Sequence, residues 1–256
     1  MEFNQKVLID IAKKAGHEIL GIYNDPQKFE VVDHKADDSP LTLADKASHN
    51  VIVKELGHAY PDIPIISEEG KVPEYDIRVN YDYYFLIDPL DGTKEFINRN
   101  GQFTVNIAVI HKNKPVLGVV YTPVSDELYF GELDKEAFKT VGTQKKFLKV
   151  NNSKNQRIAV RSKSHASPEE ESVLEKYNVV DSISVGSSLK FCMVAEGKAD
   201  IYYRHGPTME WDTAAGQAVV EAAGGNVYTG TGPDSFTYNK RNLLNGSFLC
   251  LGFMDN

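Results

Sequence analysis

The sequence predicts a mixed fold in which an N-terminal α+β part is followed by a C-terminal α/β part. Three observations support this prediction: helical patterns open the chain, alternating runs follow in its middle, and short strands alternate with helical stretches towards its end. At 256 residues the chain can bury a sizeable core, as one large domain or two small ones. We place a boundary near residue 124, which divides the chain into 1–124 and 125–256.

Each predicted element follows from its own pattern of apolar residues. Apolar residues repeat at helical spacing in two stretches, which cover residues 3–23 and 43–56. The strand patterns of the middle region predict an antiparallel meander, with strands at 104–111, 115–121 and 127–131. The α/β part is predicted from further short strands, at 158–160, 182–185 and 200–203.

The composition is that of a globular protein with an acidic balance. The formal net charge of −8 argues against a nucleic-acid polymer as partner, because such a partner demands a basic surface. No apolar run approaches the roughly 20 residues of a membrane span, and the first residues lack a signal-peptide pattern. Cys192 and Cys250 lack the spacing of a zinc site or a disulfide framework and are expected to be reduced core residues. We expect a cytoplasmic protein; the sequence leaves peripheral association with the inner membrane and the oligomeric state open.

The most informative stretch, IDPLDGTKEF at 87–96, sets two carboxylates three residues apart. An apolar run at 83–87 predicts a buried strand, so Asp88 falls at its exit and Asp91 lies beyond a rigid turn. Two acids on one side of a fixed turn can bridge a hard cation, and oxygen-only ligands suit Mg²⁺. The alternative is an Asp-Gly turn that joins two strands.

Two other stretches carry acids in a similar position. Residues 64–67 predict a short strand that runs into Glu68 and Glu69, which either reach the same site or form solvated surface. The stretch 210–225 predicts a helix with Asp212 at its start and glycines at its end. Asp212 is therefore either a helix N-cap or a further acid of the site.

Taken together, the three motifs resemble those of the inositol monophosphatase superfamily. The matching segments are SEE at 67–69, DPLDGT at 88–93 and WDTAAG at 211–216. The resemblance covers nearly the whole chain and implies a layered α-β-α-β-α sandwich of the inositol monophosphatase and fructose-1,6-bisphosphatase type. It also implies that the N-terminal part carries most metal ligands, whereas the C-terminal part carries Asp212 and the nucleotide-binding residues.

Three further segments narrow the resemblance: KADDSPLTLAD at 35–45, GSSLKF at 186–191 and YRHGPT at 203–208. They are similar to segments of the CysQ-type 3′(2′),5′-bisphosphate nucleotidases. The resemblance implies a Mg²⁺-dependent, lithium-sensitive phosphatase that converts adenosine 3′,5′-bisphosphate to AMP and phosphate, in sulfur assimilation or nucleotide recycling. Its partner would be a small nucleotide bisphosphate. The alternatives are an inositol or sugar monophosphatase of the same fold and a non-catalytic nucleotide or metal sensor.

The resemblance assigns metal ligands and catalytic groups to residues of this sequence. Two or three Mg²⁺ ions would be held by four carboxylates and one main-chain carbonyl, from Glu68, Asp88, Asp91, Asp212 and Leu90. The Thr93 hydroxyl would orient the attacking water, and the catalytic residues would be Glu68, Thr93, Asp37 and Asp45. From the residues alone, Thr42 and Asp45 also match a capping box, and Asp37 has a solvated surface acid as its alternative.

Substrate recognition is expected mainly in the C-terminal part. Ser187 and Ser188 precede an apolar helical stretch, where hydroxyl and N–H groups can bind an anion. Lys190 and Arg204 add positive charge. His165 resembles a substrate-contacting histidine of the nucleotidases, with a surface histidine as the alternative. The complete set of expected substrate-binding residues is Gly92, Thr93, His165, Ser187, Ser188, Lys190, Arg204 and Asp212.

Overall fold

The structure is a computed structural model that describes residues 1–34, 40–151, 156–162 and 168–254. The helices in these residues are α1 (Gln5–Tyr23), α2 (Pro26–Phe29), α3 (Leu43–Ala59), α4 (Tyr75–Arg78), α5 (Thr93–Ile97), α6 (Pro168–Lys176), α7 (Leu189–Ala195) and α8 (Glu210–Ala222). The strands are β1 (Val32–His34), β2 (Pro40–Thr42), β3 (Ile65–Ser67), β4 (Tyr83–Asp91), β5 (Thr104–His111), β6 (Lys114–Thr122), β7 (Glu127–Glu132), β8 (Glu136–Val141), β9 (Gln144–Phe147), β10 (Arg157–Arg161), β11 (Val179–Ser184), β12 (Ile201–Arg204), β13 (Thr208–Met209), β14 (Asn226–Thr229), β15 (Leu244–Asn245) and β16 (Phe248–Leu251).

Two large sheets form the frame of the molecule. The first has seven strands in the order β3-β4-β5-β6-β7-β8-β9, in which β3 and β4 are parallel and the other neighbours are antiparallel. The second has five strands in the order β11-β10-β12-β16-β14, with parallel pairs around β10 and antiparallel pairs around β16. Two small sheets, β1-β2 and β13-β15, complete the set in the described residues.

The predicted meander is confirmed as β5, β6 and β7, and the sheet continues beyond it. Strands β8 and β9, which sequence analysis did not predict, pair on from β7. Because β6 pairs with β7, the sheet is continuous across residue 124. A division of the chain at that residue stays a prediction.

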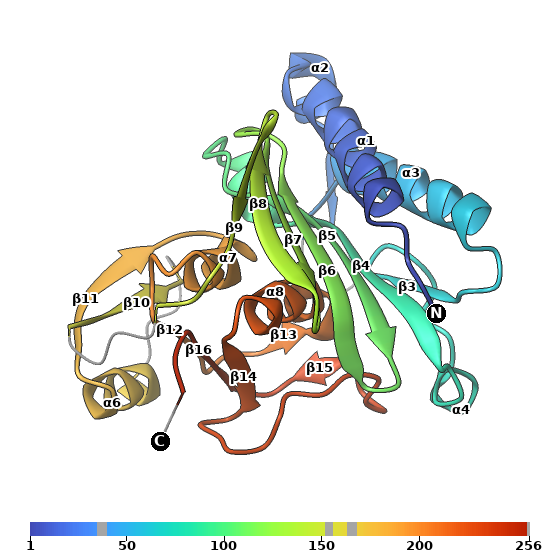
Figure 1. Cartoon of the computed structure of the whole chain (residues 1–256). Helices are drawn as coiled ribbons and strands as arrows, with labels where there is room; N and C mark the ends of the chain where they lie inside the picture. Colours follow the sequence, from blue (N-terminus) through green and yellow to red (C-terminus); the bar gives the residue numbers. More distant parts are fainter. Residues whose placement is uncertain (35–39, 152–155, 163–167, 255–256) are drawn as a thin grey trace.

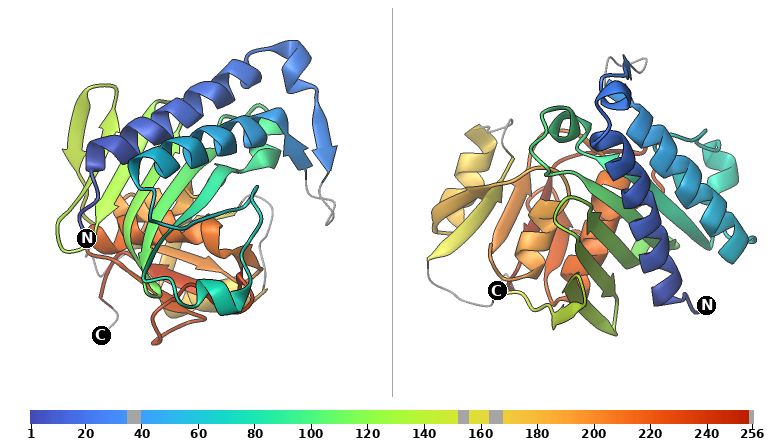
Figure 2. Two further views of the ribbon diagram at one scale, coloured as in Figure 1. Left: turned by 90° about the vertical axis from the view of Figure 1, so that its right-hand side faces the viewer. Right: turned by 90° about the horizontal axis from the view of Figure 1, so that it is seen from above.

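Helices and sheets alternate in five layers (Figures 1 and 2). Helices α1 and α3 lie side by side over one face of the seven-stranded sheet, and α7 and α8 fill the space between the two sheets. Helix α6 covers the outer face of the five-stranded sheet. The expected α-β-α-β-α sandwich is therefore confirmed.

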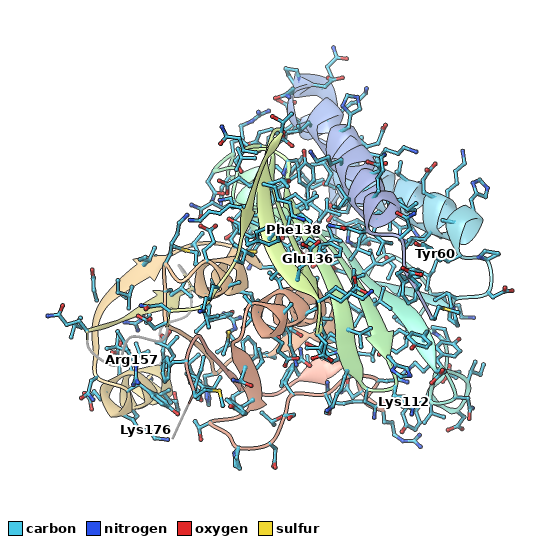
Figure 3. All side chains as sticks on the ribbon, viewed as in Figure 1. Tyr60, Lys112, Glu136, Phe138, Arg157 and Lys176 are labelled. Carbon is cyan, nitrogen blue, oxygen red and sulfur yellow. The ribbon has the colours of Figure 1, made fainter. Side chains whose placement is uncertain are left out.

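Side-chain caps set the starts of both outer helices. Asn4 caps α1, and Thr42 caps α3 in the predicted capping box with Asp45. Tyr60, labelled in Figure 3, directly follows α3. The centroid of its ring lies 5.4 Å from the centroid of the Phe3 ring. Its hydroxyl accepts the main-chain N–H of Asn4 at 2.9 Å. The start of α1 is thus tied to the end of α3.

Helix α8 lies directly on β6 and β7 because both strands present a glycine to it. A Cβ atom on Gly118 would collide with the main-chain oxygen of Ala215, and one on Gly131 would collide with the backbone of Val219. A larger residue at either position would push the helix away from the sheet. Since α8 also contacts β4 and β5, this close approach brings its first turn to the end of β4.

Candidate active site

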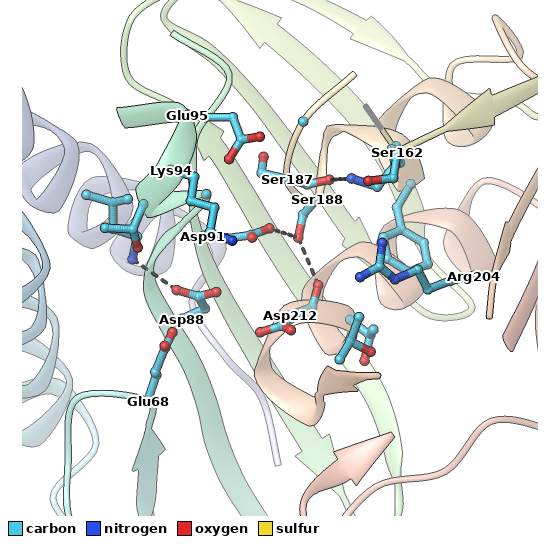
Figure 4. Close-up of a pocket in the computed structure, with 18 of the residues that line it drawn as sticks. Glu68, Asp88, Asp91, Lys94, Glu95, Ser162, Ser187, Ser188, Arg204 and Asp212 are labelled. Carbon is cyan, nitrogen blue, oxygen red and sulfur yellow. Dashed lines mark hydrogen bonds between the residues drawn. The ribbon is translucent and has the colours of Figure 1, made fainter. Parts of the chain in front are cut away.

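A polar cavity of about 450 Å³ opens where the end of β4, α5, the start of α7, β12 and the first turn of α8 meet. Figure 4 shows acidic side chains on one side of this cavity and Arg204 on the other. All but one of the predicted site residues that the structure describes line its wall; Asp45 lies behind Thr93. Asp37 and His165 lie outside the described residues.

Three carboxylates gather at the floor of the cavity from three different elements. Strands β3 and β4 are parallel neighbours in which Ser67 pairs with Ile87, so the residues that follow, Glu68 and Asp88, lie at the same edge. Asp212 approaches them from the first turn of α8. One carboxylate oxygen of each acid lies within 4.8 Å of those of the other two. The predicted convergence of three separate motifs is present in the structure.

The closeness of these acids changes how they ionise. Burial raises the pKa of Asp88 well above its ordinary value, and the negative charges of Glu68, Asp91 and Asp212 raise it further. Burial and the charge of Asp91 raise the pKa of Asp212, while the N–H of Met209 opposes this rise. Like charges held together in this way favour a bound cation, and carboxylate oxygens are the ligands that hard divalent ions prefer. The donor set fits the metal site that the sequence predicts.

The next candidates lie in the last residues of β4, which runs on to Asp91 although its pairing with β5 shifts between Asp88 and Asp91. The Leu90 N–H donates to Asp88 Oδ1 at 3.0 Å, and Leu90 lines the cavity. Asp91 Oδ2 accepts a hydrogen bond from Ser188 Oγ at 2.7 Å. Gly92 has φ +93°, a left-handed conformation that favours glycine, and it turns the chain into α5. A bulge at the end of β4, rather than the predicted turn, therefore sets the spacing between Asp88 and Asp91, and the chain turns only at Gly92.

Thr93 forms a pair with a carboxylate of α3. Its Oγ1 donates to Asp45 Oδ1 at 3.3 Å. The other oxygen of Asp45, Oδ2, accepts the N–H and the hydroxyl of Thr42, at 2.7 and 2.6 Å. The two interpretations of Asp45 from sequence are therefore compatible, because one oxygen caps the helix while the other faces Thr93.

The positively charged wall comes from β12 and α7. Among the described residues, the Nε atom of Arg204 is buried without a hydrogen-bond partner. Lys190 is 7% exposed, and its Nζ donates to the main-chain oxygen of Ser187 at 2.6 Å. Burial lowers the pKa of Lys190 to about 8, although the charge of Asp91 opposes this fall. Ser187 itself has φ +46°, so the Lys190 bond supports a backbone conformation that is uncommon for serine.

The structure corrects the predicted position of Asp212 in its helix. Helix α8 begins at Glu210 with Met209 as its N-cap, so Asp212 is the third residue of the helix rather than its cap. The Asp212 Oδ2 atom accepts the N–H of Met209 at 2.8 Å. Asp212 thus contributes to helix capping and to the acidic floor at once.

Comparison with known proteins identifies the family. The model of the inositol monophosphatase family matches residues 1–250. The chain belongs to this family. It is 44% identical over 238 residues to 3′(2′),5′-bisphosphate nucleotidase CysQ of Shigella flexneri, an alignment that covers 93% of this chain and 95% of the relative. The protein of the same name from Haemophilus influenzae is 37% identical, with 97% and 92% covered.

Solved structures agree with this assignment. The crystal structure of CysQ from Bacteroides thetaiotaomicron has a TM-score of 0.86 and 43% identity, covering 98% of this chain and 97% of that one. The extragenic suppressor protein suhB from Bartonella henselae has a TM-score of 0.77 at 25% identity, with 96% and 92% covered. Members of the inositol monophosphatase family depend on metal ions, in keeping with the acidic cluster. In the described part of the chain, no helix combines the length and apolar character needed to cross a bilayer.

Several residues of this site have no role predicted from the sequence. Lys94 and Glu95 line the cavity. Their position directly after Thr93 in IDPLDGTKEF could have indicated this from the sequence. Asn106 in β5 is 1% exposed, and its amide donates to the Ser188 hydroxyl at the cavity wall. A polar amide inside an apolar strand needs a hydrogen-bond partner, and this could have indicated its role from the sequence. Tyr202 lines the cavity as well, but its sequence context predicts only a strand residue.

Proposed function

We propose that this chain is a Mg²⁺-dependent 3′(2′),5′-bisphosphate nucleotidase that converts adenosine 3′,5′-bisphosphate to AMP and phosphate. The observation that carries the proposal is a partly buried acidic floor opposite an arginine whose Nε has no partner among the described residues. An acidic floor selects cations and, through them, one phosphate, whereas the arginine offers charge to a second anionic group. The 44% identity to relatives named 3′(2′),5′-bisphosphate nucleotidase CysQ supports this choice of substrate.

The residues that would hold two or three Mg²⁺ ions are the acids Glu68, Asp88, Asp91 and Asp212, with the carbonyl of Leu90. When bound, such ions would neutralise phosphate charge and promote ionisation of the attacking water. A donor set made only of oxygen atoms supports Mg²⁺ over softer metals that prefer imidazole or thiolate.

Thr93 and Asp45 provide a path for the proton of the attacking water. Because the Thr93 hydroxyl donates to Asp45, its oxygen keeps lone pairs that can accept a hydrogen bond from a water beside the phosphate. Thr42 holds the far oxygen of Asp45, so the carboxylate keeps this orientation. Glu68 is the other group we propose to act on this water. A role for Asp37 stays a prediction.

Arg204 would bind the anionic part of the nucleotide that lies away from the metals. Lys190 and Ser187 contribute indirectly, since Lys190 supports the Ser187 backbone at the cavity wall. Gly92 leaves room there, because a Cβ atom on it would lie 3.2 Å from Cβ of Ser187. Substrate contact by His165 and a cytoplasmic location stay predictions. We propose a small nucleotide as partner and no nucleic-acid polymer, in keeping with the net charge of −8.

A phosphate-release assay with a substrate panel tests the proposal. The purified chain with Mg²⁺ should release phosphate from adenosine 3′,5′-bisphosphate faster than from inositol 1-phosphate or fructose 1,6-bisphosphate. Chelation should abolish release, and lithium chloride should inhibit it more than potassium chloride at the same concentration. A preference for inositol 1-phosphate would instead assign a monophosphatase of the same fold, and absence of turnover on the whole panel would favour a non-catalytic sensor.

A further inference from the structure

Asp91 stands apart from the other acids of the floor. In the described part of the chain, the tight carboxylate group comprises Glu68, Asp88 and Asp212. Asp91 is not in this group, although its charge raises the pKa of both Asp88 and Asp212. Neutral side chains hold its carboxylate: Oδ2 lies 2.7 Å from Ser188 Oγ and 3.4 Å from Asn106 Nδ2. One oxygen of Asp91 is therefore already engaged by the protein itself.

These contacts form a continuous buried chain from β5 to α8. Asn106 Nδ2 donates to Ser188 Oγ at 2.8 Å, and Asn106 Oδ1 accepts from Thr104 Oγ1 at 3.0 Å. Since the Thr104 hydroxyl occupies Oδ1, the amide turns its N–H groups towards Ser188 and Asp91. Ser188 Oγ also lies 2.9 Å from the main-chain oxygen of Asp212. A dashed line marks this contact in Figure 4.

Ser188 is engaged by the protein rather than open to a ligand. The residue is 2% exposed, and its hydroxyl accepts from Asn106 while its single proton serves Asp91 or the Asp212 carbonyl. A phosphate oxygen of a substrate could accept from this hydroxyl only by taking its single proton from Asp91 or from the Asp212 carbonyl. The sequence predicts that Ser188 contacts the substrate, whereas this environment favours a role in holding other side chains.

We propose that Asn106 and Ser188 are positioning residues that hold Asp91 Oδ2, so that Asp91 Oδ1 is presented to a cation. A carboxylate can rotate about its last bond, and fixing one oxygen sets the direction of the other. Partners of this kind orient metal ligands, and their loss typically weakens metal binding about 10–100-fold. The inference rests on the proposed metal site and adds the groups that shape it.

Direct titration with Mn²⁺ tests this role without using turnover as its only readout. Free Mn²⁺ is followed by electron paramagnetic resonance in wild type, Ser188→Ala and Asn106→Ala, because Mn²⁺ takes the same oxygen ligands as Mg²⁺. We expect both variants to bind Mn²⁺ about 10–100-fold more weakly in at least one class of site. Thr104→Val, which frees the far side of the Asn106 amide and removes a 3.3 Å contact with the Ser187 hydroxyl but leaves both partners of Asp91 in place, should weaken Mn²⁺ binding less. The KM for the bisphosphate nucleotide at saturating metal should stay at the wild-type value.

Asn239→Ala is the matched control. Asn239 is another buried amide, 6% exposed, whose side chain bonds Arg78 outside the cavity. This variant should lower the melting temperature but leave Mn²⁺ affinity unchanged. Wild-type Mn²⁺ affinity in Ser188→Ala, or a raised nucleotide KM without a metal effect, would overturn the positioning role alone. Wild-type protein that binds no Mn²⁺ would overturn the proposed metal site and the positioning role with it.

Discussion

At the scale of single residues, the ionised form of Asp88 is unfavourable for folding but needed for metal binding. Burial and three neighbouring acids raise its pKa, so its charge destabilises the metal-free fold at neutral pH. We expect Asp88→Asn to raise the melting temperature in EDTA, because an amide can still accept the Leu90 N–H. Loss of a residue that only orients a metal ligand typically lowers metal affinity or activity about 10–100-fold. Loss of the ligand itself should therefore lower the rate of phosphate release with Mg²⁺ more than about 100-fold.

Thermal melts in EDTA and phosphate-release rates with Mg²⁺ check this prediction. Asp62→Asn, at an exposed acid outside the cavity, is the control and should change neither quantity. An Asp88→Asn protein that melts no higher than wild type, or that turns over normally, would contradict the assigned role.

A second residue-scale prediction concerns Arg204. Its truncation to alanine removes a charge-assisted contact, which should cost about 1.5–3 kcal/mol. At 1.36 kcal/mol per factor of ten, this corresponds to a rise in the nucleotide KM of about 13–160-fold. The KM for a simple phosphate ester should change far less, since that substrate lacks the second anionic group. Steady-state kinetics with both substrates measures the difference.

Arg241→Ala provides the matched control for that experiment. Arg241 lies outside the cavity, its side chain is 75% exposed, and its contact with Asp76 is long at 3.8 Å. The control should leave both KM values at wild type. Equal effects of Arg204→Ala on the two substrates would show that this arginine does not read the nucleotide.

At the scale of elements, the start of α3 couples helix stability to catalysis. Thr42 caps this helix and also holds Asp45, which in turn faces Thr93. Thr42→Val should therefore lose about 0.5–2 kcal/mol of stability and also lower kcat, because Asp45 loses one of the groups that orient it. Asn4→Ala removes the cap of α1, which is remote from the cavity, and should cost stability alone.

Denaturant unfolding and kcat measured on both cap variants separate these effects. A parallel loss of kcat in the two variants would mean that general destabilisation, and not the Asp45 contact, limits turnover. Unchanged kcat in Thr42→Val would argue that Thr93 does not depend on an oriented Asp45.

At the scale of the whole molecule, the acids of the core make stability depend on pH and on metal. Folding raises the pKa of Asp88 and Asp212, and burial raises that of Glu221 to about 7. Each acid has a higher pKa in the folded chain than in the unfolded chain, so its protonated form favours the folded state. Its contribution to the free energy of unfolding is complete below the unfolded pKa of about 4 and is lost as pH rises through the folded pKa. We expect the melting temperature in EDTA to fall between about pH 4 and pH 7.

Bound Mg²⁺ should oppose that fall, since it stabilises the ionised acids. At 100 times the dissociation constant, a ligand of the folded state adds about 2.7 kcal/mol. Melts at several pH values with and without Mg²⁺ should therefore diverge as pH rises. Glu221→Gln should reduce the pH dependence without removing the effect of Mg²⁺. Parallel curves would contradict a metal site in the acidic cluster.

The layered fold was predictable to the extent that its elements bury one face. The buried positions of α1 and α3 recur at helical spacing, and β5 and β6 have strongly apolar cores, so local patterns locate them. Strand β9 was missed because all its residues are exposed and it carries no burial pattern. Strand β8 was also missed, since it buries only Ala137 and Phe138.

The sequence predicted that Glu68, Asp88 and Asp212 belong to one site, because each lies in a short motif at the end of a strand or the start of a helix and the three motifs together resemble those of one family. Tertiary structure alone decided how these motifs meet, through parallel pairing of β3 with β4 and close packing of α8 on Gly118. It also decided that Ser188 faces inward. Local sequence patterns indicate which residues form helices or strands and which are buried. The hydrogen-bond partner of a buried hydroxyl depends instead on residues far away in the sequence.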